Sequence, residues 1–547
     1  VPALVGKYVF DANSDIVQLL RDRGALLFAE TYQHSYPYCW RSKTPIIFRA
    51  VEQFFIRLDE LRGKALDAIT KVKWLPAWGE NRIAGTVESR PDWVISRQRS
   101  WGVPLPVFYS AEGEPILNAE WIRRLADLVG KRGSNVWFEL SDADLVRELD
   151  LPAGLTKRND TIDVWIDSGV SHKAVCAARP ELHDPAEVYI EATDQHRGWF
   201  QSSLMTSVAL HDRAPYKTCI THGFVVDVDG KKISKSSSYE KPMDAMHFVK
   251  KHGADIVRLW VSSVNYTDDV PFSEEMFTRL GDTYRRIRNT LRILHGNLFD
   301  FEAEPASEPT LVDRWIVTRL RDVVADCRAA YERYEFHKVY HTINDFCAVD
   351  LSSLYIDITK DRMYCDAADS PRRRATQSAM REIYDALCRL LAPILAFTAE
   401  EAWSYLQSDT SVHAQLFPQL SGRRDDYAVS AMNEALALRE EVTRELEQAR
   451  QHKIVGNSLE AKVCIEVQRK KLVYDWFDDL PTLEEILILS DLRLVDGVET
   501  KAVVGRSEFA KCARCWRHRE SVGKSQTYPD LCGRCEAVVT EATKVVK

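Results

Sequence analysis

The chain has 547 residues, of which 45% are hydrophobic and 28% are charged. This is an ordinary composition for a globular protein, and the length is too great for one core, so we expect three or four domains. The formal net charge of −8 argues against a generally basic nucleic-acid coat, although local basic faces remain possible. With no apolar run of 18 residues and no signal pattern, we expect a cytoplasmic protein without membrane contact.

The first 260 residues change character along the chain. Residues 1–30 resemble the end of a domain, and residues 30–110, rich in aromatics and prolines, predict short strands and packed loops. From residue 160 the pattern becomes α/β: "TIDVWID", "EVYIE" and "CITHGFVVDV" predict buried strands. The segment after "EVYIE", which reads "ATDQHRGWFQSSLMTSVAL", predicts a loop that opens into a helix.

Helical periodicity dominates from about residue 275. Apolar residues recur there at spacings of three and four, as in Leu320, Val323, Val324, Cys327 and Tyr331. This pattern predicts a helix bundle that continues to about residue 450. The sequence "IVGNSLEAKVCIEV" then predicts the start of a small mixed α/β subdomain.

The C-terminal cysteines have metal-ligand spacing. Cys512, Cys515, Cys532 and Cys535 form two C-x2-C knuckles separated by sixteen residues. Two such knuckles can complete a tetrahedral, structural Zn²⁺ site; two disulfides are the alternative, disfavoured by the absence of a secretion signal. Four basic residues lie around the first knuckle, beside Trp516, namely Arg514, Arg517, His518 and Arg519. They suit either an RNA contact or a solvated surface.

Polar residues directly follow the strand predicted at "EVYIE". Glu191, Asp194, Gln195 and His196 fall where open α/β sheets bind ligands, at the carboxyl end of a strand. Their side chains suit ribose hydroxyls and an ammonium group, and the following helix N-terminus suits an anion. Helix capping by Thr193 or Asp194 is a second role for the same segment.

The stretch "VDGKKISKSS" places two lysines around a hydroxyl. Lys232 and Lys235 flank Ser234 beyond a "DG" turn. With a nucleotide at the strand ends, these ammonium groups would stabilise the charge that grows as pyrophosphate leaves. A charge-rich exposed loop without function is the alternative.

Several blocks together resemble the bacterial isoleucyl-tRNA synthetases, a family of class I aminoacyl-tRNA synthetases. "KISKS" is similar to that family's KMSKS loop, with Ile233 in place of methionine. Valyl, leucyl or methionyl relatives would also fit this loop, but the remaining blocks and the cysteine quartet favour the isoleucyl family. These blocks occur in the family's order: "DWVISRQRSWGVPLP", "DVWIDSG", "DQHRGWF", "THGF", "GADIVRLWV" and "YRRIRNT".

The resemblance implies a multidomain α/β plus α protein. Its expected parts are the tail of an editing domain (1–30), the second half of a Rossmann-type catalytic domain (31–275), a helical anticodon-binding domain (276–450), a small α/β subdomain (451–505) and a zinc module (506–547). The implied activity joins isoleucine to tRNA(Ile), with ATP and Mg²⁺, through isoleucyl-AMP. A monomer with one Zn²⁺ is expected.

The resemblance also implies roles for individual residues. Glu191 matches the position that contacts the adenylate, and Asp194, Gln195, His196 and His222 belong to the same pocket. Trp165 in "DVWIDSG" matches a wall of the amino-acid pocket. Lys235 and Ser234 match ATP-binding positions, Lys232 and Lys235 are the expected catalytic lysines, and the cysteine quartet matches the zinc ligands.

Departures from the family pattern leave other functions open. No HIGH motif is found, so we expect that motif and the editing site upstream of Val1, and we expect this chain alone to bind tRNA without charging it. Ala192 stands where a glycine is usual. The competing readings are a shortened paralogue that only binds tRNA and, more weakly, a different nucleotidylyltransferase with a Rossmann core.

Overall fold

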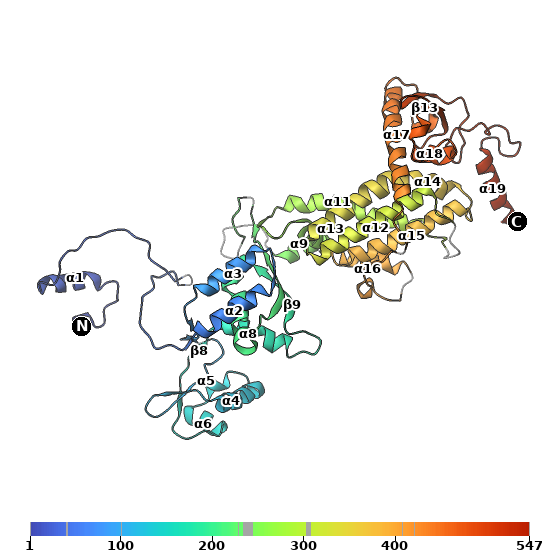
Figure 1. Ribbon diagram of the computed structural model, residues 1–547. Helices are drawn as coiled ribbons and strands as arrows, with labels where there is room; N and C mark the ends of the chain where they lie inside the picture. The colour runs from blue at the N-terminus through green and yellow to red at the C-terminus, as the bar shows by residue number, and fades with distance from the viewer. Residues whose placement is uncertain are drawn as a thin grey trace. The chain divides into compact units, whose positions relative to one another are not determined.

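The computed structural model describes residues 2–39, 42–99, 101–227, 229–233, 244–301, 308–406, 409–420 and 422–545 (Figure 1). The chain forms two compact units. The first comprises residues 1–71, 84–185 and 198–215, and the second comprises residues 72–83, 186–197 and 216–547. Among the residues described, no helix combines the length and apolarity that crossing a membrane requires.

The first unit contains short strands and helices. The helices are α1 (Asn13–Asp22), α2 (Asp59–Thr70), α4 (Ala119–Arg132), α5 (Val136–Glu139), α6 (Asp142–Glu148), α7 (Val164–Gly169) and α8 (Trp199–His211). Antiparallel two-residue strands connect them, namely β1 (Phe55–Ile56), β3 (Trp93–Val94), β4 (Ser96–Arg97), β5 (Phe108–Tyr109), β6 (Pro115–Ile116), β7 (Thr156–Lys157) and β8 (Thr161–Ile162). Helices α4–α6 and strands β5–β7 enclose a core of their own around Phe108, Trp137 and Leu145.

Two predictions for this part of the chain were wrong. Residues 30–110 hold the helix α2 and the helix α3 (Trp78–Glu88), and not only strands and loops. The block "TIDVWID" is a strand only over Thr161–Ile162. Asp163 then caps α7, accepting a hydrogen bond from the backbone N–H of Trp165 at 3.4 Å, so the β-branched run that suggested a strand is the first turn of a helix.

A three-stranded parallel sheet begins the second unit. Its order is β2 (Lys73–Leu75), β10 (Tyr216–His222) and β9 (Ala186–Ala192). The predicted strand at "EVYIE" is confirmed as β9, and Glu191 and Ala192 lie opposite Thr221 and His222 of β10. A 3₁₀ turn, Thr193–Arg197, follows β9 directly.

Amphipathic helices fill the middle of the second unit, and those from α11 onward lie where the apolar spacing predicted a helix bundle (Figure 1). They are α9 (Ala245–His252), α10 (Ala254–Ser263), α11 (Glu274–Gly296), α12 (Leu311–Glu332), α13 (Phe336–Asp345), α14 (Ile356–Cys365), α15 (Pro371–Leu391), α16 (Ala396–Ser404) and α17 (Asp426–Gln451). Helix α12 starts in a capping box in which Thr310 and Asp313 satisfy each other's backbone N–H groups. The apolar faces of α10–α17 form one buried core.

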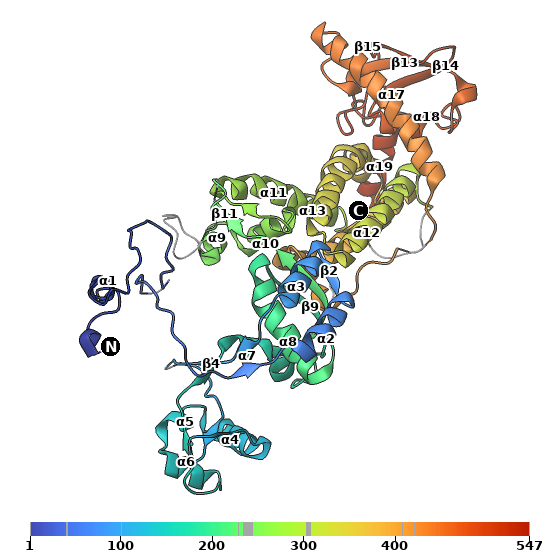
Figure 2. The ribbon, with the colours of Figure 1, turned by 60° about the vertical axis from the view of Figure 1, so that its left-hand side comes forward.

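Helix α17 carries this core into the C-terminal subdomain. A small sheet of order β14 (Asp491–Asp496), β13 (Ala461–Val467) and β15 (Lys501–Arg506) packs beside α17 and α18 (Leu480–Ile486) (Figure 2). Trp476 and Leu483 are fully buried in the same apolar cluster as the bundle. The two cysteine knuckles and α19 (Gly533–Val545) end the chain.

Candidate nucleotide site and zinc module

The carboxyl ends of β9 and β10 bring the predicted adenylate residues to one edge of the sheet. Glu191 is exposed there, and one of its carboxylate oxygens accepts a hydrogen bond from the backbone N–H of Ala192 at 3.0 Å. In the turn that follows, Asp194 is exposed and Gln195 is half-buried. His222 ends β10 opposite Ala192. Two strands thus supply a carboxylate and an imidazole at the same edge.

His196 is a packed part of this edge. It is 1% exposed, and its ring packs against those of Trp74 and Trp78, with centroid distances of 6.4 and 5.7 Å. Its Nδ1 lies 3.0 Å from the carbonyl oxygen of Thr193. Burial lowers the pKa of His196, so a neutral ring is favoured. This histidine therefore shapes the turn from within; neither Trp74 nor Trp78 was anticipated from the sequence.

The "THGF" block makes a tight turn after β10. A Cβ atom on Gly223 would lie 2.2 Å from the carbonyl oxygen of Asp268, so only glycine fits this backbone approach. The backbone N–H of Phe224 donates to a carboxylate oxygen of Asp269 at 2.7 Å. Strand β11 (Val225–Val226) then pairs with β12 (Val270–Pro271) in parallel. The turn thereby fixes where the Lys/Ser loop starts.

A hairpin at the start of that loop orients Lys232. Val226 pairs with Lys232 across a turn in which Gly230 has φ +77°. The ammonium nitrogen of Lys232 lies 3.5 Å from the centroid of the Phe224 ring, a cation–π contact. Ser234 and Lys235, the other predicted ATP-binding residues, lie outside the described residues.

Trp165 belongs to the first unit. It is 40% exposed on α7. Asp163 is 4% exposed and caps that helix. Its carboxylate also binds two residues of the "DWVISRQRSWG" block. The indole Nε1 of Trp93 donates to it at 2.9 Å, and the guanidinium of Arg97 pairs with it at 2.9 Å. Two blocks that are distant in sequence therefore jointly position the helix that carries Trp165.

The four C-terminal cysteines form one buried cluster. Their sulfur atoms all lie within 4.8 Å of one another, and the Sγ atoms of Cys515 and Cys532 are 3.8 Å apart. A tetrahedron with Zn–S bonds of about 2.3 Å has edges of about 3.8 Å, and a disulfide would need about 2.0 Å. The cluster fits Zn²⁺, and the alternative of two disulfides is wrong.

The knuckle arginines contact other parts of the chain, and their contact with RNA stays a prediction. Arg517 is 6% exposed and pairs with Glu484 at 2.8 Å and with Asp361 at 3.5 Å. Arg519 pairs with the same Glu484, and Arg514 donates to the carbonyl oxygen of Cys365. A sequence cannot show which basic side chains point inward, and here their acidic partners lie more than 30 residues away.

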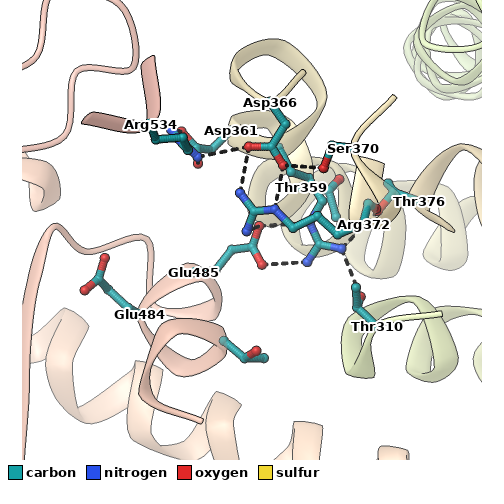
Figure 3. Close-up of polar contacts among 12 residues, drawn as sticks. Thr310, Thr359, Asp361, Asp366, Ser370, Arg372, Thr376, Glu484, Glu485 and Arg534 are labelled. Atoms are coloured by element: carbon teal, nitrogen blue, oxygen red, sulfur yellow. Dashed lines mark hydrogen bonds and ion pairs between the residues drawn. The ribbon is translucent and has the colours of Figure 1, made fainter. Parts of the chain in front are cut away.

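Further ionic contacts join the bundle, α18 and the knuckle residue Arg534, and Figure 3 shows part of them. Arg534 binds Asp361 and Asp366, and Arg372 binds Asp366 with two hydrogen bonds of 2.5 and 2.8 Å. The fully buried Arg362 binds Glu485 at 2.6 Å and Asp313 at 3.3 Å. The zinc module is thereby tied to the bundle by ion pairs, among them that of Arg534 with the mostly buried Asp361.

Helix α11 carries four arginines at the surface. They are Arg285, Arg286, Arg288 and Arg292, all exposed. Arg285 pairs with Asp282, Arg286 donates to Asn344 at 3.0 Å, and Arg288 pairs with Glu401 at 3.0 Å. Exposed pairs of this kind contribute little stability and exchange readily for a phosphate.

Comparisons with known proteins agree with this arrangement. Residues 12–273 match the family model "tRNA synthetases class I (I, L, M and V)". Residues 313–465 match "Anticodon-binding domain of tRNA ligase", and residues 509–538 match "Zinc finger found in FPG and IleRS".

Two curated relatives are isoleucine–tRNA ligases. The chain is 46% identical to the isoleucine–tRNA ligase of Methylacidiphilum infernorum (isolate V4), over 98% of this chain and 59% of the relative. It is 41% identical to that of Caldanaerobacter subterraneus subsp. tengcongensis, over 100% of this chain and 61% of the relative. A solved methionyl-tRNA synthetase from Mycobacterium tuberculosis, in complex with methionyl-adenylate, aligns with a TM-score of 0.49 and 17% identity, covering 68% of this chain and 65% of that one.

The three family-model matches together indicate a chain similar to class I tRNA synthetases. Over nearly its whole length, the chain is similar to relatives named isoleucine–tRNA ligase. It spans about 60% of the length of the curated relatives it matches. The predicted family, fold class and structural zinc are thereby confirmed.

Proposed function

We propose that the protein carrying this sequence joins isoleucine to tRNA(Ile) with ATP and Mg²⁺. The observation that carries the proposal is the identity of 46% and 41%, over nearly the whole chain, to relatives named isoleucine–tRNA ligase. The edge formed by β9 and β10, with Glu191, His196 and His222, supports it, because strand ends are where such sheets bind nucleotides.

The first step would form an anhydride at this edge. A carboxylate oxygen of isoleucine attacks the α-phosphorus of ATP, and pyrophosphate leaves. Lys232 and Lys235, with Ser234, would meet the charge on the departing pyrophosphate. Lys232 would exchange its contact with Phe224 for a phosphate, because a full anion attracts an ammonium group more strongly than a ring does.

Glu191, Asp194 and Gln195 would hold the adenylate from the β9 side. Exposed carboxylates suit both the substrate ammonium and the ribose hydroxyls. Trp165 would supply an apolar wall for the isoleucine side chain, and the Asp163 contacts with Trp93 and Arg97 would fix that wall. In the second step, a ribose hydroxyl at the tRNA 3′ end attacks the carbonyl carbon, and AMP leaves.

The helical segment and the zinc module would hold tRNA. The exposed arginines of α11 support this role, because their weak surface pairs leave the guanidinium groups available. The knuckle arginines would act indirectly by fixing the module on the bundle. We propose action as a monomer in the cytoplasm.

Charging assays test the proposal. The protein that carries this sequence together with the expected upstream segment is incubated with ATP, Mg²⁺, tRNA(Ile) and one of isoleucine, valine or leucine, and the charged tRNA is measured. We expect charging that depends on isoleucine. Binding of tRNA without isoleucine-dependent pyrophosphate exchange would instead favour the shortened paralogue, and nucleotide transfer to another acceptor would favour a different nucleotidylyltransferase.

A further inference from the structure

A second group of metal-ligand side chains lies in the first unit, far in sequence from the cysteine quartet. His172 is in the π-helical turn His172–Cys176, Asp184 is in the loop that follows, and His211 is the last residue of α8. One ring nitrogen from each histidine and one carboxylate oxygen lie within 4.8 Å of one another. The two rings are 5.9 Å apart and nearly perpendicular.

The tautomer of His172 follows from its partner Thr206. The hydroxyl of Thr206 lies within 2.9–3.1 Å of the carbonyl oxygens of Gly169, Ser202 and Ser203, which can only accept. Its single proton therefore goes to a carbonyl, and its oxygen must accept from Nε2 of His172, 3.3 Å away. The neutral ring then has its lone pair on Nδ1.

That lone pair meets no donor. His172 is fully buried, and within the described part of the chain its Nδ1 has no hydrogen-bond partner. Oδ1 of Asp184, also buried, is likewise without a partner there. Two buried acceptors therefore lie in one cluster, and leaving both unmet costs free energy.

The outer contacts are those of a metal site. Ligating histidines usually donate their second N–H to an acceptor, as His172 does to Thr206. Ligating carboxylates are usually hydrogen-bonded as well, and Arg213 donates to the other oxygen of Asp184 at 3.2 Å, and to its carbonyl oxygen at 3.0 Å. His211 is exposed, so one side of the cluster opens to water.

We propose that His172, Asp184 and His211 bind one divalent metal ion of the zinc class, with water as the fourth ligand. Two imidazoles and a carboxylate form a three-ligand set that Zn²⁺ takes with a water. The ion would cross-link the segment after α7 to the end of α8. Trp165, the residue proposed to line the amino-acid pocket, lies on α7. The ion would therefore rigidify the segment that directly follows the helix carrying Trp165.

Zinc stoichiometry tests this site without any measurement of activity. Untagged protein is stripped with a chelator, equilibrated across a series of buffered free Zn²⁺ concentrations, and analysed for bound zinc. We expect two ions per chain, the second binding more weakly than that of the cysteine quartet. With Co²⁺, the second ion should add d–d absorption without thiolate-to-metal charge transfer.

Matched variants assign the second ion. His211→Gln removes an exposed side chain, so folding should be unaffected. His211→Gln and Asp184→Asn, each as a single variant, should abolish binding of the second ion. Thr206→Val should weaken binding about 10–100-fold by releasing the tautomer of His172. His183→Gln, which removes the exposed imidazole next to Asp184, should leave two ions. One ion in the wild type, or a second ion that survives in His211→Gln and Asp184→Asn, would overturn the proposal.

Discussion

The guanidinium of Arg534 donates two hydrogen bonds to the carboxylate of Asp361, at 2.7 and 2.9 Å. Arg534 lies between two zinc ligands, Cys532 and Cys535, whereas Asp361 lies on α14 of the bundle. Because the zinc fixes the knuckle, it also fixes where Arg534 points. Burial alone would raise the pKa of Asp361, but the hydrogen bonds from Arg534 and the charge of Arg517 outweigh it and lower the pKa.

Zinc removal should therefore loosen more than the knuckles. We expect stripping to speed amide hydrogen exchange over residues 510–535 and over α14 near Asp361, because metal binding and folding are coupled in such modules. Strands β9 and β10 should exchange at unchanged rates. Arg534→Met should reproduce the effect on α14 with zinc still bound. Unchanged exchange in α14 after both treatments would show that the junction does not depend on the knuckle.

Acid should weaken the bundle through Asp300. Arg373 binds this carboxylate with two contacts of 2.8 and 2.9 Å. Burial raises the pKa of Asp300, but hydrogen bonds from Arg373 and Gln377 outweigh it and lower the pKa. A lowered folded-state pKa stabilises the fold above the unfolded value of about 3.9, and this stabilisation is lost as the pH falls through the folded-state pKa.

The variant Asp300→Asn isolates this contribution. The substitution leaves the guanidinium of Arg373, which is 4% exposed, without the charged carboxylate that it binds. We therefore expect the free energy of the local opening that exposes the α15 amides to exchange to fall by about 3 kcal/mol near pH 7. Below about pH 4 the difference from wild type should shrink. Hydrogen exchange measures this opening locally, which suits a chain with several domains. A difference that stays constant down to pH 2 would contradict the assignment.

Gly223→Ala should disrupt the turn after β10. The new Cβ would lie 2.2 Å from the carbonyl oxygen of Asp268, so the backbone must shift. Since a displacement of about 1 Å in a catalytic site costs about 100-fold, isoleucine-dependent pyrophosphate exchange should fall by roughly that factor. Gly63→Ala is the control, because no atom lies within 4 Å of its Cβ position. Equal activity in the two variants would rule out a constrained turn.

Asp163→Ala should act on isoleucine binding. It removes the cap of α7 and leaves Arg97 without its 2.9 Å partner, so Trp165 should lose its fixed position. We expect KM for isoleucine to rise more than KM for ATP. Loss of the cap alone should cost about 1 kcal/mol of helix stability. Asp160→Asn, three residues earlier, is the control; a purely structural role would shift both KM values together.

Local patterns predicted some of these features, and long-range partners decided the rest. The cysteine quartet and strand β9 could be predicted because spacing and periodicity are properties of short segments. The direction of Arg517 could not, because Glu484 and Asp361 come from other segments. The cap of α7 was misread because Val164, Trp165 and Ile166 suit a strand equally well. His172, Asp184 and His211 are separated by 12 and 27 residues, and no motif links them.

The pyrophosphate exchange of Lys235→Ala, compared with Lys231→Ala, tests the central claim most directly when it is measured in the protein that also carries the expected upstream segment. Both variants remove one ammonium group from the same loop, but only Lys235 is proposed to meet the departing pyrophosphate. Loss of such a charge donor costs roughly 3 kcal/mol in the transition state, so we expect isoleucine-dependent exchange to fall about 100-fold in Lys235→Ala and to stay within about twofold of wild type in Lys231→Ala. Wild-type protein that shows no isoleucine-dependent exchange, or a Lys235→Ala variant as active as Lys231→Ala, would contradict the account.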